Sequence, residues 1–242
     1  MYCIYDRNKR VILWWSPKSG CSFIKKLFLF LLNKEIKHTD AIDSGLHENT
    51  RNYYNPFMKD FTHILFIRNP YHRFVSCFIQ TYIKKWGDDD IRLAKGIEAD
   101  RLPYLTFNYF VNTVLKNKKS LHREWFVNDH FKPQITNYNK QFNFTKIFDL
   151  YNIDYDYLSN HFGKDIKIPT INYLRETGMN HVNIQNDYYK EPVYDYTVNT
   201  FKDIKFIPKY KYFYNDDLKQ KVREIYKEDF DFFESNGFKF DV

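Results

Sequence analysis

Cysteine, glycine, proline and long apolar runs are all scarce in this chain of 242 residues, which has 3 Cys, 7 Gly and 8 Pro. Three cysteines exclude a framework of several disulfide bonds, and no CxxC or Cys/His spacing suggests zinc. So little glycine and proline excludes fibrous and low-complexity chains. The longest apolar run, Leu27–Leu32, is too short for a membrane span, and the polar start MYCIYDRNKR is unlike a signal peptide. We expect a soluble protein of a reducing, intracellular compartment, with no membrane insertion.

Aromatic residues and positive charge are abundant instead. Phe, Trp and Tyr make up 20% of the residues, so the core must be built largely from rings. The net charge of +7 favours an anionic partner such as a nucleotide or an acidic glycan, although compositional drift towards lysine would produce the same charge. The chain has no run of five to eight Lys/Arg residues, which argues against nucleic acid as a partner.

Two strand–loop–helix units organise the N-terminal part of the chain. Residues 11–15 form an apolar run of β-formers, followed by a tight loop over 16–20 and a helix over 23–32. The arrangement recurs as a strand over 62–67 and a helix that begins at Pro70 and runs to about Lys85. These units predict an α/β fold, a central parallel sheet with a P-loop-like phosphate site and flanking helices, in a single domain over residues 1–242.

The remaining elements follow from apolar spacing and turn residues. We expect a helical face over 104–114, a strand over 146–150 and a helix over 154–163 closed by Gly163. The polar, aperiodic segment 175–215 predicts a long loop. Residues 216–235 predict one closing amphipathic helix.

The first motif is Pro17-Lys-Ser-Gly-Cys-Ser-Phe23, where the first strand passes into its helix. Backbone N–H groups and a helix N-terminus meet at such a junction and attract phosphate. Lys18 adds a positive charge, Gly20 permits close approach of the backbone, and Ser22 can donate its hydroxyl. The NTPase pattern GxxxxGK[ST] is absent, because Lys18 precedes Gly20. A plain turn between strand and helix is the alternative.

The second motif is Arg68-Asn-Pro-Tyr-His-Arg-Phe-Val-Ser76, after the second strand. Arg68 stands at the carboxyl end of that strand, where ligands of open α/β sheets bind. Arg68 and Ser76 could converge on a second phosphate, with bidentate contacts from the guanidinium. A structural ion pair at Arg68 is the alternative.

Together the two motifs resemble sulfotransferases that use 3′-phosphoadenosine 5′-phosphosulfate (PAPS), most closely the carbohydrate sulfotransferases. The first is similar to their 5′-phosphosulfate loop and the second to their 3′-phosphate segment. His130-Phe-Lys-Pro-Gln134, preceded by Trp125, is similar to the HW-x-PQ segment of Golgi members, and Tyr226-Lys-Glu-Asp-Phe230 to their C-terminal helix. Trp86-Gly-Asp-Asp89 is similar to a segment of the uronyl 2-O-sulfotransferases.

The resemblance implies sulfuryl transfer from PAPS to a hydroxyl, by in-line displacement and without a metal. Catalysis would then rest on positioning and electrostatics, with Lys18 stabilising the leaving phosphate. The run Asp88-Asp89-Asp90 is interpreted as a solvated turn. The residues that the resemblance assigns to donor binding are Lys18, Ser19, Gly20, Cys21, Ser22, Phe23, Arg68 and Ser76.

The general base should come from the acceptor side, and several glycan sulfotransferases take a His from the interval between the two phosphate motifs. His47 lies in that interval, in a polar, aperiodic segment. His38 and His63 share the interval, but their places at a helix end and a strand start favour structural roles. Glu48 and His130 remain the alternative bases.

The chain departs from the family pattern at three points. Asn69 stands where Asp is usual, the cysteines that commonly follow the HW-x-PQ segment are missing, and so is a membrane anchor. The last two features favour a soluble enzyme of bacterial or viral origin. A carbohydrate is the first choice of acceptor, before tyrosine, a small alcohol or a phenol. The alternatives from other classes are a nucleotide or small-molecule kinase, for which only Asp149 could serve as the Mg²⁺ carboxylate, and a non-catalytic glycan-binding module.

Overall fold

A computed structural model describes residues 1–34, 48–49, 56–83, 99–120, 129–135, 142–167, 184–186, 191–203 and 207–242. Its backbone contacts divide the chain into two compact units. Unit 1 comprises residues 1–68 and 136–181, and unit 2 comprises residues 69–135 and 182–242. Both units are built from separate stretches of chain, and the single domain over 1–242 stays a prediction.

Unit 1 is built on a five-stranded sheet with the order β3-β1-β2-β4-β5. Its strands are β1 (Tyr2–Asp6), β2 (Val11–Trp15), β3 (Glu48–Asn49), β4 (Thr62–Ile67) and β5 (Lys146–Asp149). Strands β2, β4 and β5 are parallel, as the two strand–loop–helix units predict. Strand β1 was not predicted, and it pairs antiparallel with both β2 and β3, so the sheet is mixed.

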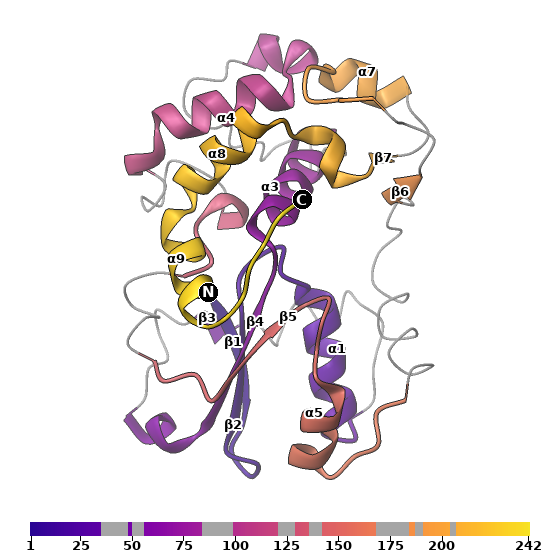
Figure 1. The fold of residues 1–242 in the computed structure, drawn as a ribbon. Helices are drawn as coiled ribbons and strands as arrows, with labels where there is room; N and C mark the ends of the chain where they lie inside the picture. The colour runs from indigo at the N-terminus through magenta and orange to yellow at the C-terminus, as the bar shows by residue number, and fades with distance from the viewer. Residues whose placement is uncertain are drawn as a thin grey trace. The chain divides into compact units, whose positions relative to one another are not determined.

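Helices α1 (Cys21–Leu31) and α5 (Tyr155–Phe162) cover one face of this sheet (Figure 1). Alternate strand residues point into the same core, because successive side chains of a strand face opposite sides. The core gathers Val11, Leu13, Trp15, Ile64, Phe66 and Phe148 from the strands and Ile24, Leu27, Phe28, Leu158 and Phe162 from the helices. Helix α5 begins after the N-cap Asp154 and ends at Gly163, whose φ is 65°, as predicted.

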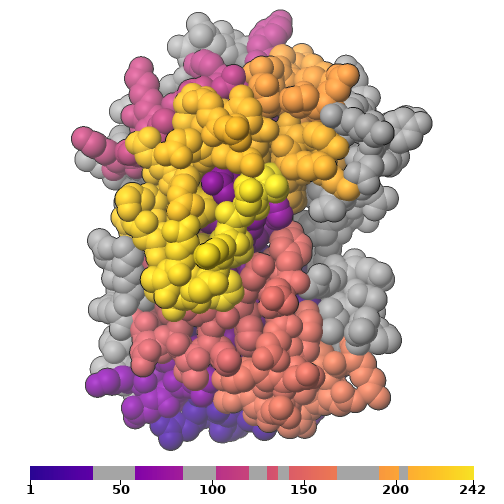
Figure 2. Space-filling view, in the orientation of Figure 1, coloured from indigo at the N-terminus to yellow at the C-terminus, as the bar shows by residue number. Residues whose placement is uncertain are grey.

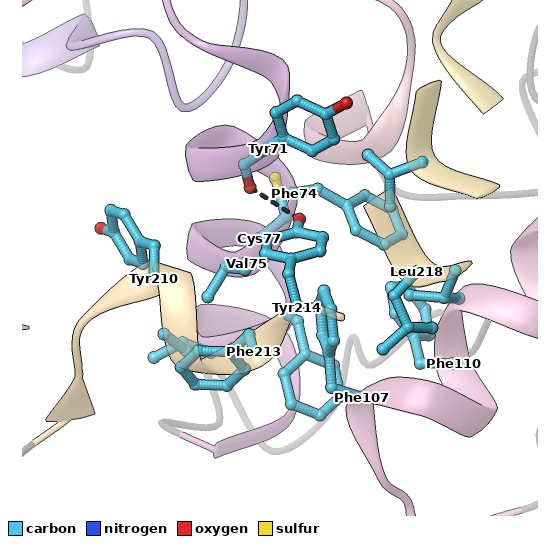
Figure 3. Close-up of a cluster of buried hydrophobic side chains, with 14 of the residues drawn as sticks. Tyr71, Phe74, Val75, Cys77, Phe107, Phe110, Tyr210, Phe213, Tyr214 and Leu218 are labelled. Atoms are coloured by element: carbon cyan, nitrogen blue, oxygen red, sulfur yellow. Dashed lines mark hydrogen bonds between the residues drawn. The ribbon is translucent and has the colours of Figure 1, made fainter. Parts of the chain in front are cut away.

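Unit 2 packs its helices around α3 (Pro70–Phe78), which continues as a π-helical turn over Ile79–Ile83. Its other longer helices are α4 (Phe107–Lys116), α8 (Asp216–Ile225) and α9 (Lys227–Ser235). Aromatic rings fill the core, as the composition predicts (Figure 3). The C-terminal residues, yellow in Figure 2, form one contiguous part of the surface of this unit.

Two expectations about unit 2 are wrong. The single closing helix over 216–235 is two helices that meet at Tyr226, where φ is −106° and ψ is 32°. The described parts of the expected loop 175–215 contain β6 (Ile184–Asn186), α7 (Val198–Asp203), β7 (Ile207–Pro208) and a 3₁₀ turn over Tyr210–Phe213. Burial of Val198, Phe201 and Phe213 in the core stabilises these short elements, although their sequence has no clear periodicity.

Candidate functional site

The loop between β2 and α1 is the centre of the site in unit 1. Ser16 and Ser19 are buried, their hydroxyl oxygens lie 2.8 Å apart, and the Ser19 amide donates to the Ser16 carbonyl at 3.1 Å. Lys18 and Gly20 both adopt left-handed backbone conformations, with φ of 65° and 81°. No side chain of the described residues caps α1 at Gly20. The positive end of the α1 dipole therefore lies at this loop, where it favours an anion.

Gly20 is required here for steric reasons. A Cβ atom at this position would lie 2.4 Å from Cδ1 of Leu150, the residue after β5. The backbone of Leu150 is held in place, because its amide donates to the Ile67 carbonyl at 2.8 Å. The loop between β2 and α1 is thus packed against the Leu150 side chain, and glycine suits both the left-handed backbone and this contact.

We expect Gly20→Ala to lower the free energy of unfolding by about 2–5 kcal/mol, the sum of left-handed strain and overpacking. Gly163→Ala is the matched control, because Gly163 has φ of 65° and nothing within 4 Å of a built Cβ. Gly163→Ala should lower the free energy of unfolding only by the cost of the left-handed backbone, about 1–2 kcal/mol. Urea denaturation of both variants measures the difference, and equal losses would show that the contact with Leu150 is unimportant.

Arg68 lies directly after β4 and joins the second motif to the first. Its side chain is buried, Nη1 donates to the Lys18 carbonyl at 2.8 Å, and Nη2 donates to the Tyr151 hydroxyl at 3.1 Å. The structure therefore brings together Arg68 and the loop of residues 17–23, two parts of the predicted site that are 50 residues apart.

Tyr151 contacts Arg68, and the sequence analysis did not single it out. The side chain is 52% exposed, and its ring centre lies 5.8 Å from Cζ of Arg68. The signal that could have found it is its position just after β5, because ligands of such sheets bind beyond the carboxyl ends of the strands.

Asp149, the last residue of β5, has a structural role in the turn that follows. Its Oδ1 accepts from the Tyr151 amide at 3.3 Å. Burial raises the pKa of this carboxyl, and the Tyr151 amide and the positive charge of Arg68 offset part of the rise. Among the described residues, no group of three His, Cys, Asp or Glu side chains could hold a metal ion.

The other residues of the first motif differ in how far they are buried. Cys21 and Ser22 begin α1 and are half-buried, and the Cys21 Sγ accepts from the Trp15 indole at 3.0 Å. Phe23 is buried in the core of unit 1, so its ring is not exposed to a ligand. Lys18 is half-buried.

Ser76 lies in α3 of unit 2 and is half-buried. The helix begins at Asn69, whose Oδ1 accepts from the Tyr71 amide at 2.9 Å and whose Nδ2 donates to the Asp241 carbonyl at 2.6 Å. The usual Asp could make only the first of these bonds, which explains why Asn suits this chain. Arg68 and Ser76 belong to different units, and their joint binding of one phosphate stays a prediction.

The candidate bases lie in different parts of the chain. His47 and His38 lie outside the described residues. Glu48 is in β3, where its backbone pairs with Cys3. His63 is buried, and its Nε2 donates to the Met58 carbonyl at 3.0 Å. Burial lowers the pKa of His63, so this ring is a neutral structural group, in agreement with the sequence analysis.

His130 is half-exposed and lies in a 3₁₀ turn over Asp129–Phe131. The backbone that follows it is held by a buried carboxylate: Oδ2 and Oδ1 of Asp229 accept from the amides of Gln134 and Ile135 at 2.9 and 2.8 Å. Burial raises the pKa of Asp229 to about 6, although Arg73 and the two amides oppose the rise.

The comparisons with known proteins concern the family of the chain. The model of a family described as the sulfotransferase family matches residues 2–236. Neither the curated proteins nor the solved structures contain a match. No helix in the described ranges has both the length and the apolar character needed to cross a bilayer.

Proposed function

Because the chain belongs to the sulfotransferase family, we propose that it transfers the sulfuryl group of PAPS to a hydroxyl group of a carbohydrate. The family generally uses PAPS as donor, and membership favours sulfuryl transfer over the kinase alternative. One observation carries the assignment to this site. The Arg68 guanidinium donates to the Lys18 carbonyl, so Arg68, the first residue of the second motif, lies against the first motif at the carboxyl edge of the sheet.

Two groups of residues would hold the donor. The Lys18 ammonium and the N-terminus of α1 suit the 5′-phosphosulfate, because the positive end of the helix dipole favours an anion there. Arg68 suits the 3′-phosphate, and Ser76 adds a hydroxyl by resemblance. A buried guanidinium that is already oriented by two hydrogen bonds loses little freedom when it binds an anion.

In the reaction, the acceptor oxygen forms a bond to sulfur while the bond from sulfur to the 5′-phosphate oxygen breaks. The acceptor proton passes to His47, and negative charge grows on the departing 3′,5′-ADP next to Lys18. Positioning and electrostatics therefore supply the catalysis. Glu48 and His130 are the alternative bases. The net charge of +7 suits an acidic carbohydrate.

We expect Arg68→Ala to weaken 3′,5′-ADP relative to adenosine 5′-monophosphate by roughly ten- to a hundred-fold, because a charge-assisted contact is lost. The ratio of the two affinities is the measure, since loss of the bond to the Lys18 carbonyl would weaken both ligands alike. Tyr151→Phe is the control: it removes the hydroxyl that accepts from Nη2 and keeps the guanidinium. The two affinities are measured by calorimetry. If their ratio is unchanged in Arg68→Ala, Arg68 does not bind the 3′-phosphate.

An assay of sulfuryl transfer tests both the proposed reaction and the proposed acceptor. The protein is incubated with radiolabelled PAPS and, separately, with polysaccharides, tyrosine peptides and phenols. Label on a polysaccharide, with no requirement for Mg²⁺, is the expected result. Label on a peptide or a phenol would support sulfuryl transfer but contradict the proposal that the acceptor is a carbohydrate. Binding of 3′,5′-ADP without transfer to any acceptor would support the glycan-binding alternative.

A further inference from the structure

The C-terminal tail, residues 238–242, belongs to unit 2 and runs back from α9 towards α3, in yellow in Figure 1. Helix α9 is followed by Gly237, which has φ of 85°, and the Phe238 amide donates to the Phe233 carbonyl at 2.9 Å. This is the Schellman pattern, in which a left-handed glycine turns the chain away from the helix. Phe240 then packs against Phe233, with ring centres 5.7 Å apart. These contacts direct the tail back over its own unit.

Asn69 joins the tail to the start of α3. Its side-chain amide makes a bond on each side: Oδ1 accepts from the Tyr71 amide at 2.9 Å, and Nδ2 donates to the Asp241 carbonyl at 2.6 Å. Asn69 is buried, so water competes little for either bond. A carboxylate has only acceptors, and a serine hydroxyl is shorter by one bond. Either could cap the helix, but neither could also hold the tail.

A second contact holds the same point of the tail. Lys219 of α8 pairs with Asp241, with 3.1 Å between Nζ and Oδ1, and Oδ1 also accepts from the Val242 amide at 2.8 Å. The Asp241 side chain is 77% exposed, so the ion pair contributes little. Of these two contacts with the rest of the unit, the buried bond from Asn69 is therefore the stronger.

The tail acts on the start of the second motif, because Asn69 directly follows Arg68 in the chain. The Asn69 carbonyl accepts from the Arg73 amide at 2.9 Å, in the first turn of α3. Fixing Asn69 therefore fixes the backbone on one side of Arg68, from which the guanidinium extends. A group whose backbone is already fixed loses less freedom when it binds an anion.

We propose that the tail is a strap that strengthens donor binding, and that Asn69 is the positioning residue through which it acts. The proposal rests on the proposed function, because it needs Arg68 to bind the 3′-phosphate. Loss of the strap should then weaken 3′,5′-ADP and leave adenosine 5′-monophosphate, which has no 3′-phosphate, nearly unaffected. The strap also gives a reason for Asn at a position where the resemblance expects Asp.

Asn69→Ser and Asn215→Ser form a matched pair for the test. Asn215 is the N-cap of α8, and its Oδ1 accepts from the Leu218 amide at 2.8 Å. Serine caps a helix about as well as asparagine does, so both variants keep the cap and neither adds a charge. Only Asn69→Ser also removes a bond to the tail.

We expect Asn69→Ser to weaken 3′,5′-ADP relative to adenosine 5′-monophosphate by about ten-fold, the equivalent of one hydrogen bond, and Asn215→Ser to leave this ratio unchanged. Phe240→Ala should change the ratio in the same direction, because it loosens the tail without touching the second motif. The two effects should not add in a double variant, since both act by releasing the same tail. Calorimetry measures the affinities.

Amide hydrogen exchange follows the tail itself and needs no turnover. The amides of residues 238–242 should exchange faster in Asn69→Ser than in the wild type or in Asn215→Ser. Coupling between two sites is reciprocal, so 3′,5′-ADP should slow the exchange of these amides in the wild type, and adenosine 5′-monophosphate should slow it much less.

Two results would overturn the proposal. If the affinity ratio in Asn69→Ser equals that in Asn215→Ser, the strap does not act on the donor site. If the tail exchanges at the wild-type rate in Asn69→Ser, Asn69 does not hold it. Failure of the wild type to bind 3′,5′-ADP would instead contradict the proposed function, and with it the effect of the strap on the donor.

Discussion

Lys18→Met should lower kcat by on the order of 10²–10³-fold and weaken PAPS binding much less. Negative charge on the 5′-phosphate oxygen grows as the bond to sulfur breaks, so the ammonium stabilises the transition state more than the bound donor. The loop should keep its shape, because the Lys18 carbonyl, and not its side chain, accepts from Arg68 at 2.8 Å. Steady-state kcat and the equilibrium affinity for PAPS are the measurements.

Lys146→Met is the matched control for this prediction. Lys146 belongs to the same unit and is exposed on β5, where its ammonium lies 5.0 Å from the centre of the Tyr157 ring. The substitution removes the same charge without touching the loop, so kcat should stay at the wild-type value. Equal losses of rate and affinity in Lys18→Met would make Lys18 a binding residue only.

His47→Ala should lower the rate of transfer by on the order of 10²–10⁴-fold, the usual contribution of a positioned base. A neutral imidazole can accept the acceptor proton near neutral pH, which a protonated lysine cannot do. Binding of 3′,5′-ADP should be nearly intact, because the donor contacts come from the loop and Arg68. The measurements are kcat across roughly pH 6–8 and the affinity for 3′,5′-ADP.

Glu48→Gln and His130→Ala complete this experiment. If His47 is the base, Glu48→Gln and His130→Ala should each keep most of the rate. A wild-type rate in His47→Ala over the whole pH range would eliminate His47. The base would then be Glu48 or His130, depending on which of the two substitutions abolishes transfer.

The sequence by itself determined the parallel part of the sheet and the position of the loop that follows β2. Strands β2 and β4 are buried, so they appear as continuous apolar runs, and the glycine that permits the loop stands next to them. Helix α5 was equally predictable, because its limits are set by the local cap Asp154 and by Gly163. These features depend on residues a few positions apart.

Only the tertiary structure decided the features that depend on distant residues. Strand β1 exists through its pairing with β2 and β3, and the short elements after residue 191 exist through burial in the core of unit 2. The close contact between Gly20 and Leu150 joins distant parts of the chain, and the bonds of Asp229 join residues 94 and 95 positions apart. Such contacts leave no periodic pattern in the sequence around either residue, because the fold brings the two residues together from distant positions in the chain.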